Sequence, residues 1–240
     1  MNIDSKQIVK YSYPIRKRKR SKTYNSKKYN DEESDEDYGP MDNENENGSG
    51  NPLNFLFGGS EIFIKGNHIW FNTSVTKTST NKLVRIIHDK NLEYIEVAKA
   101  LSEMTDMTPK PIYMHINSYG GDLLAVMAVV DAIENSKIPI HTIVEGCSAS
   151  AGTLMSVVGH HRAMTKNSFM LIHQLSSSMS GKMAEIEDDF QNNKVFMSRI
   201  KDIYERKTNM RRSEITEALV HDIWWDAKKC LKKGLIDEIV

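Results

Sequence analysis

The chain has 240 residues, 39% of them apolar, with 32 Lys or Arg balanced by 32 Asp or Glu, which suits one or two globular domains. Its two cysteines, Cys147 and Cys230, lie too far apart for a disulfide framework or a recognisable metal cluster, so neither a metal nor a cofactor is expected. The sequence contains no apolar span of about 20 residues and no signal-peptide core, which argues against membrane insertion and secretion and makes the cytoplasm the expected location.

The first 52 residues differ in composition from the rest of the chain. Residues 1–30 hold ten Lys or Arg and one Asp, whereas residues 31–46 hold nine Asp or Glu and no basic residue. Such segments bury too few apolar side chains to offset the entropy lost on ordering, so we expect a disordered charged tail over residues 1–52 and one folded domain over residues 53–240. The basic run at 15–22 also suits a nuclear localisation signal or a contact with nucleic acid or a membrane surface. A solvated tail whose halves attract each other is favoured, so no nucleic-acid or membrane partner is expected.

The first predicted element after the tail is a hairpin. Residues 59–75 are rich in β-branched and aromatic side chains on both sides of Gly66 and Asn67. This pattern predicts two short strands that turn at the Gly-Asn pair, with Trp70 and Phe71 in the core.

The next elements alternate between helices and strands. Apolar residues at helical spacing predict a helix over residues 78–99 and a second helix over residues 93–105. Residues 111–116 carry few charges and predict a strand covered on both faces. A helix over 123–134 and a strand over 138–144 follow. This order is typical of an α/β protein with parallel strands.

Residues 141–159 form the stretch on which the functional argument depends. They predict a short strand that breaks at Gly146 and small residues that lead into an apolar helix. Beyond this stretch, residues 169–174 predict a strand that ends at His173. A Ser-rich flexible segment and a long helix follow, and the chain closes with a short helix and a last strand. The long helix has an apolar stripe that would suit a second surface, and its members are Met183, Ile186, Phe190, Val195, Met197, Ile200, Ile203 and Tyr204.

Two serines stand at the strand-to-helix turn, where a hydroxyl can face backbone N–H groups. Ser148 fails the G-x-S-x-G pattern, because the chain reads G-C-S-A-S from Gly146. Ser150 is favoured by the neighbouring motifs, although a lone serine here can also be a packing residue. Cys147 is a possible thiol nucleophile, but small buried cysteines are more common.

Each partner of the serine also has a structural alternative. His173 could be a buried structural histidine whose ring nitrogens are hydrogen-bonded, and the chain has other histidines at 160, 161 and 221. Asp222 could be the N-cap of a helix that contains Trp224.

Four motifs in one order resemble the proteolytic subunit of the Clp protease over residues 62–240. They are INSYGG at 116–121, GCSASAG at 146–152, MLIHQ at 170–174, and an aspartate twelve residues before GLID. The resemblance implies a crotonase-like spiral of βαβ units with a projecting strand-helix handle. The sequence departs from the family pattern at Tyr119 and Leu175, where prolines are expected. It also departs in the segment HDIWW, which lacks the expected arginine.

The resemblance also implies roles for individual residues. Ser150 would be the nucleophile, His173 the general base and Asp222 the acid that orients it. The backbone N–H groups of Gly121 and Ala151 would form the oxyanion hole.

The function implied by the resemblance is a self-compartmentalising serine endopeptidase that hydrolyses peptides or unfolded polypeptides. The chain would assemble as a heptameric or double-heptameric homo-oligomeric ring, fed by an AAA+ unfoldase. Any ATP would be consumed by that partner, because the chain lacks the G-x-x-x-x-G-K-[ST] phosphate loop. Two alternatives stay open: a maturation protease of a viral or phage capsid, and an inactive Clp-like subunit that contributes only to assembly.

Overall fold

A computed structural model describes residues 62–101 and 108–240 of the protein. The expected tail at residues 1–52 lies outside the described residues, so that expectation stays a prediction. The described strands are β1 (Ile62–Lys65), β2 (His68–Phe71), β3 (Ile112–Ser118), β4 (Ile140–Ala149), β5 (His161–Met164), β6 (Phe169–Leu171), β7 (Trp225–Asp226) and β8 (Glu238–Ile239). The described helices are α2 (Lys77–Leu101), α3 (Leu123–Glu134), α4 (Ala151–Val157), α5 (Met183–Lys207), α6 (Arg212–Ala218) and α7 (Ala227–Lys233).

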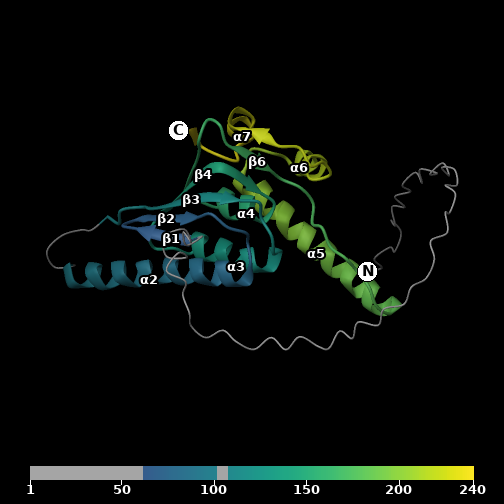
Figure 1. The fold of residues 1–240 in the computed structure, drawn as a ribbon, viewed down its shortest axis with the longest axis horizontal. Helices are drawn as coiled ribbons and strands as arrows, with labels where there is room; N and C mark the ends of the chain where they lie inside the picture. Colours follow the sequence, from purple (N-terminus) through teal and green to yellow (C-terminus); the bar gives the residue numbers. More distant parts are fainter. Residues whose placement is uncertain (1–61, 102–107) are drawn as a thin grey trace, which may run out of the picture. The chain divides into compact units, whose positions relative to one another are not determined.

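One mixed sheet organises these elements, in the order β1-β2-β3-β4-β5-β8. In this order the neighbours β2-β3-β4-β5-β8 are all parallel, and β1 joins the edge as the antiparallel partner of β2. Strand β6 pairs in parallel with the end of β4, and β7 pairs antiparallel with β6. Helices α2 and α3 lie side by side against the sheet (Figure 1). The predicted α/β class with parallel strands is therefore confirmed.

The predicted hairpin is present, with Ile62 opposite Phe71 and the turn at Gly66 and Asn67. Phe71 is fully buried, as expected. Trp70 is only half-buried, because successive strand residues point to opposite faces of a sheet. Its ring stacks on Phe63, 4.5 Å between centroids, on the face away from Phe71. The prediction of a core position for Trp70 was wrong.

The two helices predicted over 78–99 and 93–105 are one helix, α2, which runs to Leu101. Its start is fixed by Thr76, whose hydroxyl accepts a hydrogen bond from Ser79 N–H at 3.1 Å. Helix α3 has the predicted bounds, and the Asp122 side chain caps it by accepting from Ala125 N–H at 2.9 Å. This cap places the end of the glycine turn directly before α3.

Strand β4 does not break at Gly146 as predicted but continues to Ala149. Its first half pairs with β3 and β5, and its second half pairs with β6. The register against β3 shifts between these halves, and Gly146 has a positive φ of 79°, as in a bulge that bends a strand. The bend carries the end of β4 to a different partner strand and toward the site described below.

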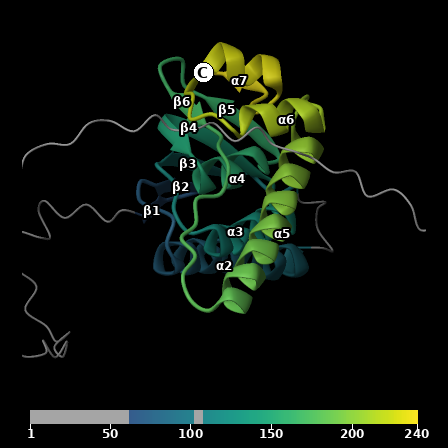
Figure 2. The same cartoon turned by 90° about the vertical axis from the view of Figure 1, so that its right-hand side faces the viewer.

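Helix α5 is the long helix that was expected beyond the Ser-rich segment. The segment between β6 and α5 carries no strand and runs beside the helix (Figure 2). Asn193 Nδ2 donates to Ser177 Oγ at 3.1 Å, which ties the two together. Of the apolar stripe, only Ile200, Ile203 and Tyr204 are buried. The amino-terminal part is exposed, and Met183 is 84% exposed.

The carboxyl-terminal region contains two elements that the sequence did not predict, α6 and β7. The final short helix and last strand are present as α7 and β8. Trp224 lies outside any helix, and α7 is capped by Asp226, which accepts from Lys229 N–H at 2.8 Å. The alternative in which Asp222 caps a helix containing Trp224 is therefore wrong.

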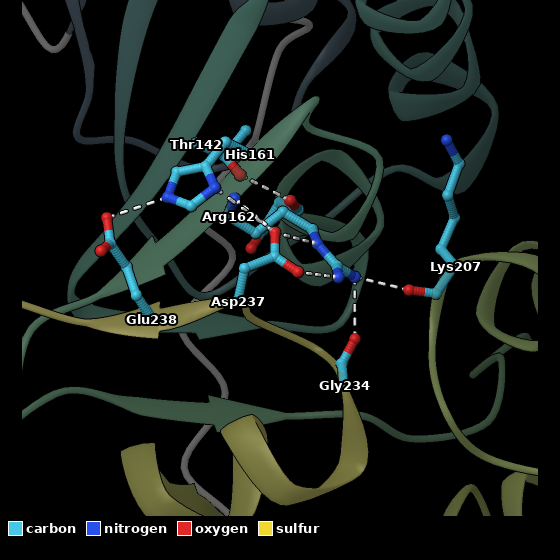
Figure 3. Close-up of polar contacts among 8 residues, drawn as sticks. Thr142, His161, Arg162, Lys207, Gly234, Asp237 and Glu238 are labelled. Atoms are coloured by element: carbon cyan, nitrogen blue, oxygen red, sulfur yellow. Dashed lines mark hydrogen bonds and ion pairs between the residues drawn. The ribbon is translucent and has the colours of Figure 1, made fainter.

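Arg162 on β5 joins three segments of the carboxyl-terminal half (Figure 3). Its guanidinium pairs with the Asp237 carboxylate and donates to the carbonyl oxygens of Gly234, at 2.8 Å, and Lys207. Hydrogen bonds from Arg162 lower the pKa of Asp237. Among the helices of the described chain, none combines the length and apolarity needed to cross a bilayer.

Candidate active site

Ser150 occupies the turn between β4 and α4 in a conformation that side chains rarely adopt. Its φ of 53° and ψ of −124° make it the one non-glycine residue with positive φ in the described chain. Its N–H donates to Leu171 O at 2.9 Å, and its carbonyl accepts from Thr153 N–H at 3.0 Å and Thr153 Oγ1 at 2.6 Å. Residues held in such backbone conformations occur often at functional sites.

The glycine turn after β3 packs against the Ser150 turn. A Cβ added to Gly120 would lie 2.6 Å from Ala149 O and 2.7 Å from Ser150 Cβ, so only glycine fits. Gly121 is equally constrained, because a Cβ there would lie 2.2 Å from Val75 O. The absence of side chains lets these two turns meet.

A pocket of about 100 Å³ opens between the two turns. Gly121, Ser150, Ala151 and His173 all line it, so four of the five predicted site residues share one cavity. The rest of the lining mixes apolar and polar side chains and comprises Leu123, Leu154, Leu175, Ile200, Gln174, Ser176 and Tyr204.

Asp222, the fifth predicted residue, lies beside His173 but is not among the residues that line the pocket. Its Oδ1 lies 3.5 Å from His173 Nδ1, with the His173 side chain 23% exposed and the Asp222 side chain 80% exposed. This separation exceeds an ordinary hydrogen bond, although catalytic contacts are often long in unliganded enzymes. His173 follows β6, and the next residue, Gln174, donates its N–H to Leu219 O at 2.7 Å.

The competing histidines are engaged elsewhere. His160 Nδ1 accepts from Ile140 N–H at 3.1 Å. His161 Nε2 lies 2.9 Å from a Glu238 carboxylate oxygen, as Figure 3 shows. His221 lines a different pocket, together with Glu214.

The other candidate nucleophiles are poorly placed. Ser148 is fully buried, and its hydroxyl has no hydrogen-bond partner among the described residues. Burial raises the pKa of the Cys147 thiol and raises that of Cys230 to about 12, so both resist ionisation. Ser150 is half-buried and is the candidate that lines the pocket together with a histidine.

Two features of the site were not predicted from sequence. Tyr204 on α5 hydrogen-bonds Thr153 on α4, although 51 positions separate them. Tyr119, in the glycine turn after β3, and Trp224, just before β7, meet edge to face with 6.3 Å between ring centroids. The departures from the family pattern at Tyr119 and in HDIWW were the only sequence signals near this second contact.

Comparison with known proteins gives one family. The Clp protease family model matches residues 62–240. The ATP-dependent Clp protease proteolytic subunit 2 of Treponema pallidum is 34% identical over 133 residues, which cover 55% of this chain and 67% of that protein. Proteolytic subunit 1 of Chlamydia trachomatis, in serovars D and A, is 29% identical over 176 residues, which cover 72% of this chain and 85% of those proteins. Because the family match extends from β1 to the end of the chain, this protein belongs to the Clp protease family of serine endopeptidases.

Proposed function

We propose that this chain hydrolyses peptide bonds in peptides or unfolded polypeptides, with Ser150 as nucleophile, His173 as general base and Asp222 as the orienting acid. The observation that carries the proposal is the shared pocket of Ser150 and His173, with Asp222 3.5 Å from the His173 nitrogen that faces it. Family membership supports the reaction class. The positive φ of Ser150 supports its role, because such strain is retained where function requires it.

The proposed reaction proceeds through an acyl-enzyme. Ser150 Oγ attacks the scissile carbonyl carbon while His173 Nε2 accepts the hydroxyl proton, since Nδ1 faces Asp222. The imidazolium then protonates the departing amine as the carbon–nitrogen bond breaks. Water attacks the ester, its proton passes to His173, and the acid product leaves as Ser150 regains a proton.

The N–H groups of Gly121 and Ala151 would stabilise the oxyanion that forms during each attack. Both residues line the pocket beside Ser150. Removing one such donor from an oxyanion hole typically costs about 10²-fold or more in rate. The apolar lining at Leu123 and Leu154 favours an apolar substrate side chain before the scissile bond.

A fluorophosphonate probe tests the proposal directly, because the oxygen of an activated serine attacks its phosphorus, displaces fluoride and leaves a stable phosphonate ester. We expect labelling of the wild-type full-length chain and loss of labelling and of peptide hydrolysis in Ser150→Ala. Ser148→Ala is the matched control, since that hydroxyl is buried two residues away and should leave labelling unchanged. Equal labelling of Ser150→Ala would contradict the proposal. An unlabelled, inactive wild type would favour the inactive-subunit alternative.

We further propose that the chain assembles into a heptameric ring or a stacked pair of such rings, and that an ATP-dependent unfoldase supplies its substrates. The exposed apolar residues Met183, Phe190 and Val195 on α5 support a second chain covering this helix. The names of the relatives include the term ATP-dependent, which supports the unfoldase. Size-exclusion chromatography with light scattering on the full chain at micromolar concentration should give ring-sized particles, and a monomer would contradict the assembly.

A further inference from the structure

Asp222 lies on an exposed arch, His221 to Trp224, between α6 and β7. The arch is anchored at its ends, because His221 N–H bonds back to a carbonyl of α6 at 3.3 Å and Trp225 enters the ladder with β6. Every side chain between these anchors is exposed, and Asp222 sits 3.5 Å from His173. Burial therefore does little to fix the carboxylate at the distance that its role requires.

One ring contact joins this arch to the glycine turn after β3. Trp224 meets Tyr119 with an interplanar angle of 87° and 6.3 Å between ring centroids. Both values fall within the range of favourable edge-to-face pairs. Tyr119 is 76% exposed and Trp224 is 41% exposed, so the contact is not imposed by a surrounding core. The pair bridges the glycine turn and the arch that carries Asp222.

The glycine turn is the rigid side of this bridge. Gly120 O accepts from Val75 N–H at 2.8 Å, and Val75 O accepts from Asp122 N–H at 2.8 Å. Gly120 N–H also donates to Ser118 Oγ at 3.1 Å. These bonds flank Tyr119 and fix its backbone. Loss of the ring contact would consequently displace the arch and leave the turn in place.

We propose that Tyr119 and Trp224 are positioning residues whose ring contact holds Asp222 against His173. The proposal rests on the triad of the proposed function. Without the contact, Asp222 spends less time beside the imidazole and stabilises the imidazolium less well. The effect is on the chemical step, because neither ring needs to touch the substrate to act in this way.

Single substitutions in the full-length chain test the contact, with a short fluorogenic peptide that carries an apolar residue before the scissile bond. Trp224→Ala and Tyr119→Ala should each lower kcat by about 2- to 10-fold with KM changed less than about 2-fold, as a ring pair of ordinary strength predicts. The double variant should lose no more than either single variant, because one contact is removed in each case. Trp224→Phe and Tyr119→Phe keep a ring and should restore most of kcat.

Ile223→Ala is the matched control. Ile223 is an exposed apolar residue of the same arch, between Asp222 and Trp224, and it takes part in neither contact. Its replacement should leave kcat and KM within about 2-fold of wild type. A loss as large as that of Trp224→Ala would show that the arch is generally fragile and would overturn the specific role of the rings.

Combination with Asp222→Asn separates this inference from the proposed function. If the rings act through Asp222, Trp224→Ala should add less than about 2-fold to the loss already caused by Asp222→Asn. A further loss of kcat in that background, or a raised KM with kcat unchanged, would overturn the positioning role and assign Trp224 to substrate contact. Unchanged kcat in Asp222→Asn alone would instead remove the triad on which the inference rests.

Discussion

At the scale of single residues, the exposure of Asp222 determines how much catalysis it can support. A buried acid that orients a histidine in a dry site contributes about 10⁴-fold to kcat. The Asp222 carboxylate is 80% exposed and 3.5 Å from His173, so water competes for it and weakens its hold. We therefore expect Asp222→Asn to lower kcat by about 10²-fold, which is less than the loss caused by Ser150→Ala.

Steady-state hydrolysis of the fluorogenic peptide measures this loss. His221→Ala is the matched control, because His221 is the neighbouring exposed residue and lines a different pocket. Its kcat should stay within about 2-fold of wild type. A kcat for Asp222→Asn that is indistinguishable from wild type would mean that another group orients His173.

The sequence favoured the residues at the pocket because their motifs are local. Ser150 follows a glycine-bounded turn, and His173 ends a short apolar strand, so each can be recognised within about ten positions. Tyr204 could not be found in this way. Tyr204 acts through the hydrogen bond of its hydroxyl with Thr153. In the sequence it is indistinguishable from the other apolar positions on the stripe of a long helix.

At the scale of elements, the Thr153–Tyr204 contact joins α5 to the Ser150 turn. Thr153 has one hydroxyl proton, and the Ser150 carbonyl at 2.6 Å can only accept it. Tyr204 must therefore donate its own proton to Thr153 Oγ1. Burial raises the pKa of Tyr204, which keeps that donor protonated. The hydrogen bonds form a directed chain from α5 to the backbone of the proposed nucleophile.

Tyr204→Phe removes the donor and keeps the ring. The lost hydrogen bond leaves Thr153 Oγ1 without its buried donor, so we expect a decrease of about 1 kcal/mol in the free energy of unfolding. We also expect a decrease of a few fold in the rate of fluorophosphonate labelling, because the Ser150 backbone is held less firmly. Labelling kinetics and urea unfolding measure the two effects.

The control for this prediction is Tyr113→Phe, since Tyr113 lies on β3 and its ring packs against His68 and His141 away from the pocket. Thr153→Val should behave like Tyr204→Phe, and the double variant should lose little more. A normal labelling rate in both single variants would show that α5 does not influence the nucleophile turn.

Strand β4 and helix α2 explain which element boundaries the sequence missed. Strand β4 bends at Gly146 instead of ending there. It continues because residues 147–149 pair with β6, more than twenty positions away. A strand pairing of this kind leaves no local signal. The prediction divided α2 into two helices because its apolar residues fit helical spacing in two overlapping windows, and each window was interpreted as a separate helix. The two-residue strand β7 is too short to carry any periodicity.

At the scale of the whole molecule, Arg162 ties β5 to β8, to the end of α7 and to the end of α5. The Asp237 carboxylate completes this junction by pairing with Arg162 and accepting from Arg162 N–H at 2.9 Å (Figure 3). The Arg162 side chain is largely buried, whereas Asp237 is about one-third exposed. Removing the charge of Asp237 would leave the mostly buried guanidinium of Arg162 without its counter-ion. A buried charge without a counter-ion destabilises the folded state.

Asp237→Asn should therefore lower the free energy of unfolding by about 1–2 kcal/mol at pH 7, after allowance for the screening of the exposed carboxylate. Hydrogen bonds from Arg162 lower the pKa of Asp237 in the folded chain, so its contribution is complete above the unfolded-state pKa of about 3.9 and is lost as pH falls through the lower folded value. The difference in the free energy of unfolding between wild type and variant should consequently be constant from pH 7 to about pH 5 and shrink below about pH 4.

Urea unfolding at fixed protein concentration measures this difference. Glu238→Gln is the control, because that neighbouring carboxylate is more exposed and contacts only His161 in this junction. A gap that stays the same at pH 3, or one that Glu238→Gln reproduces, would mean that the ionic pair does not hold these segments together.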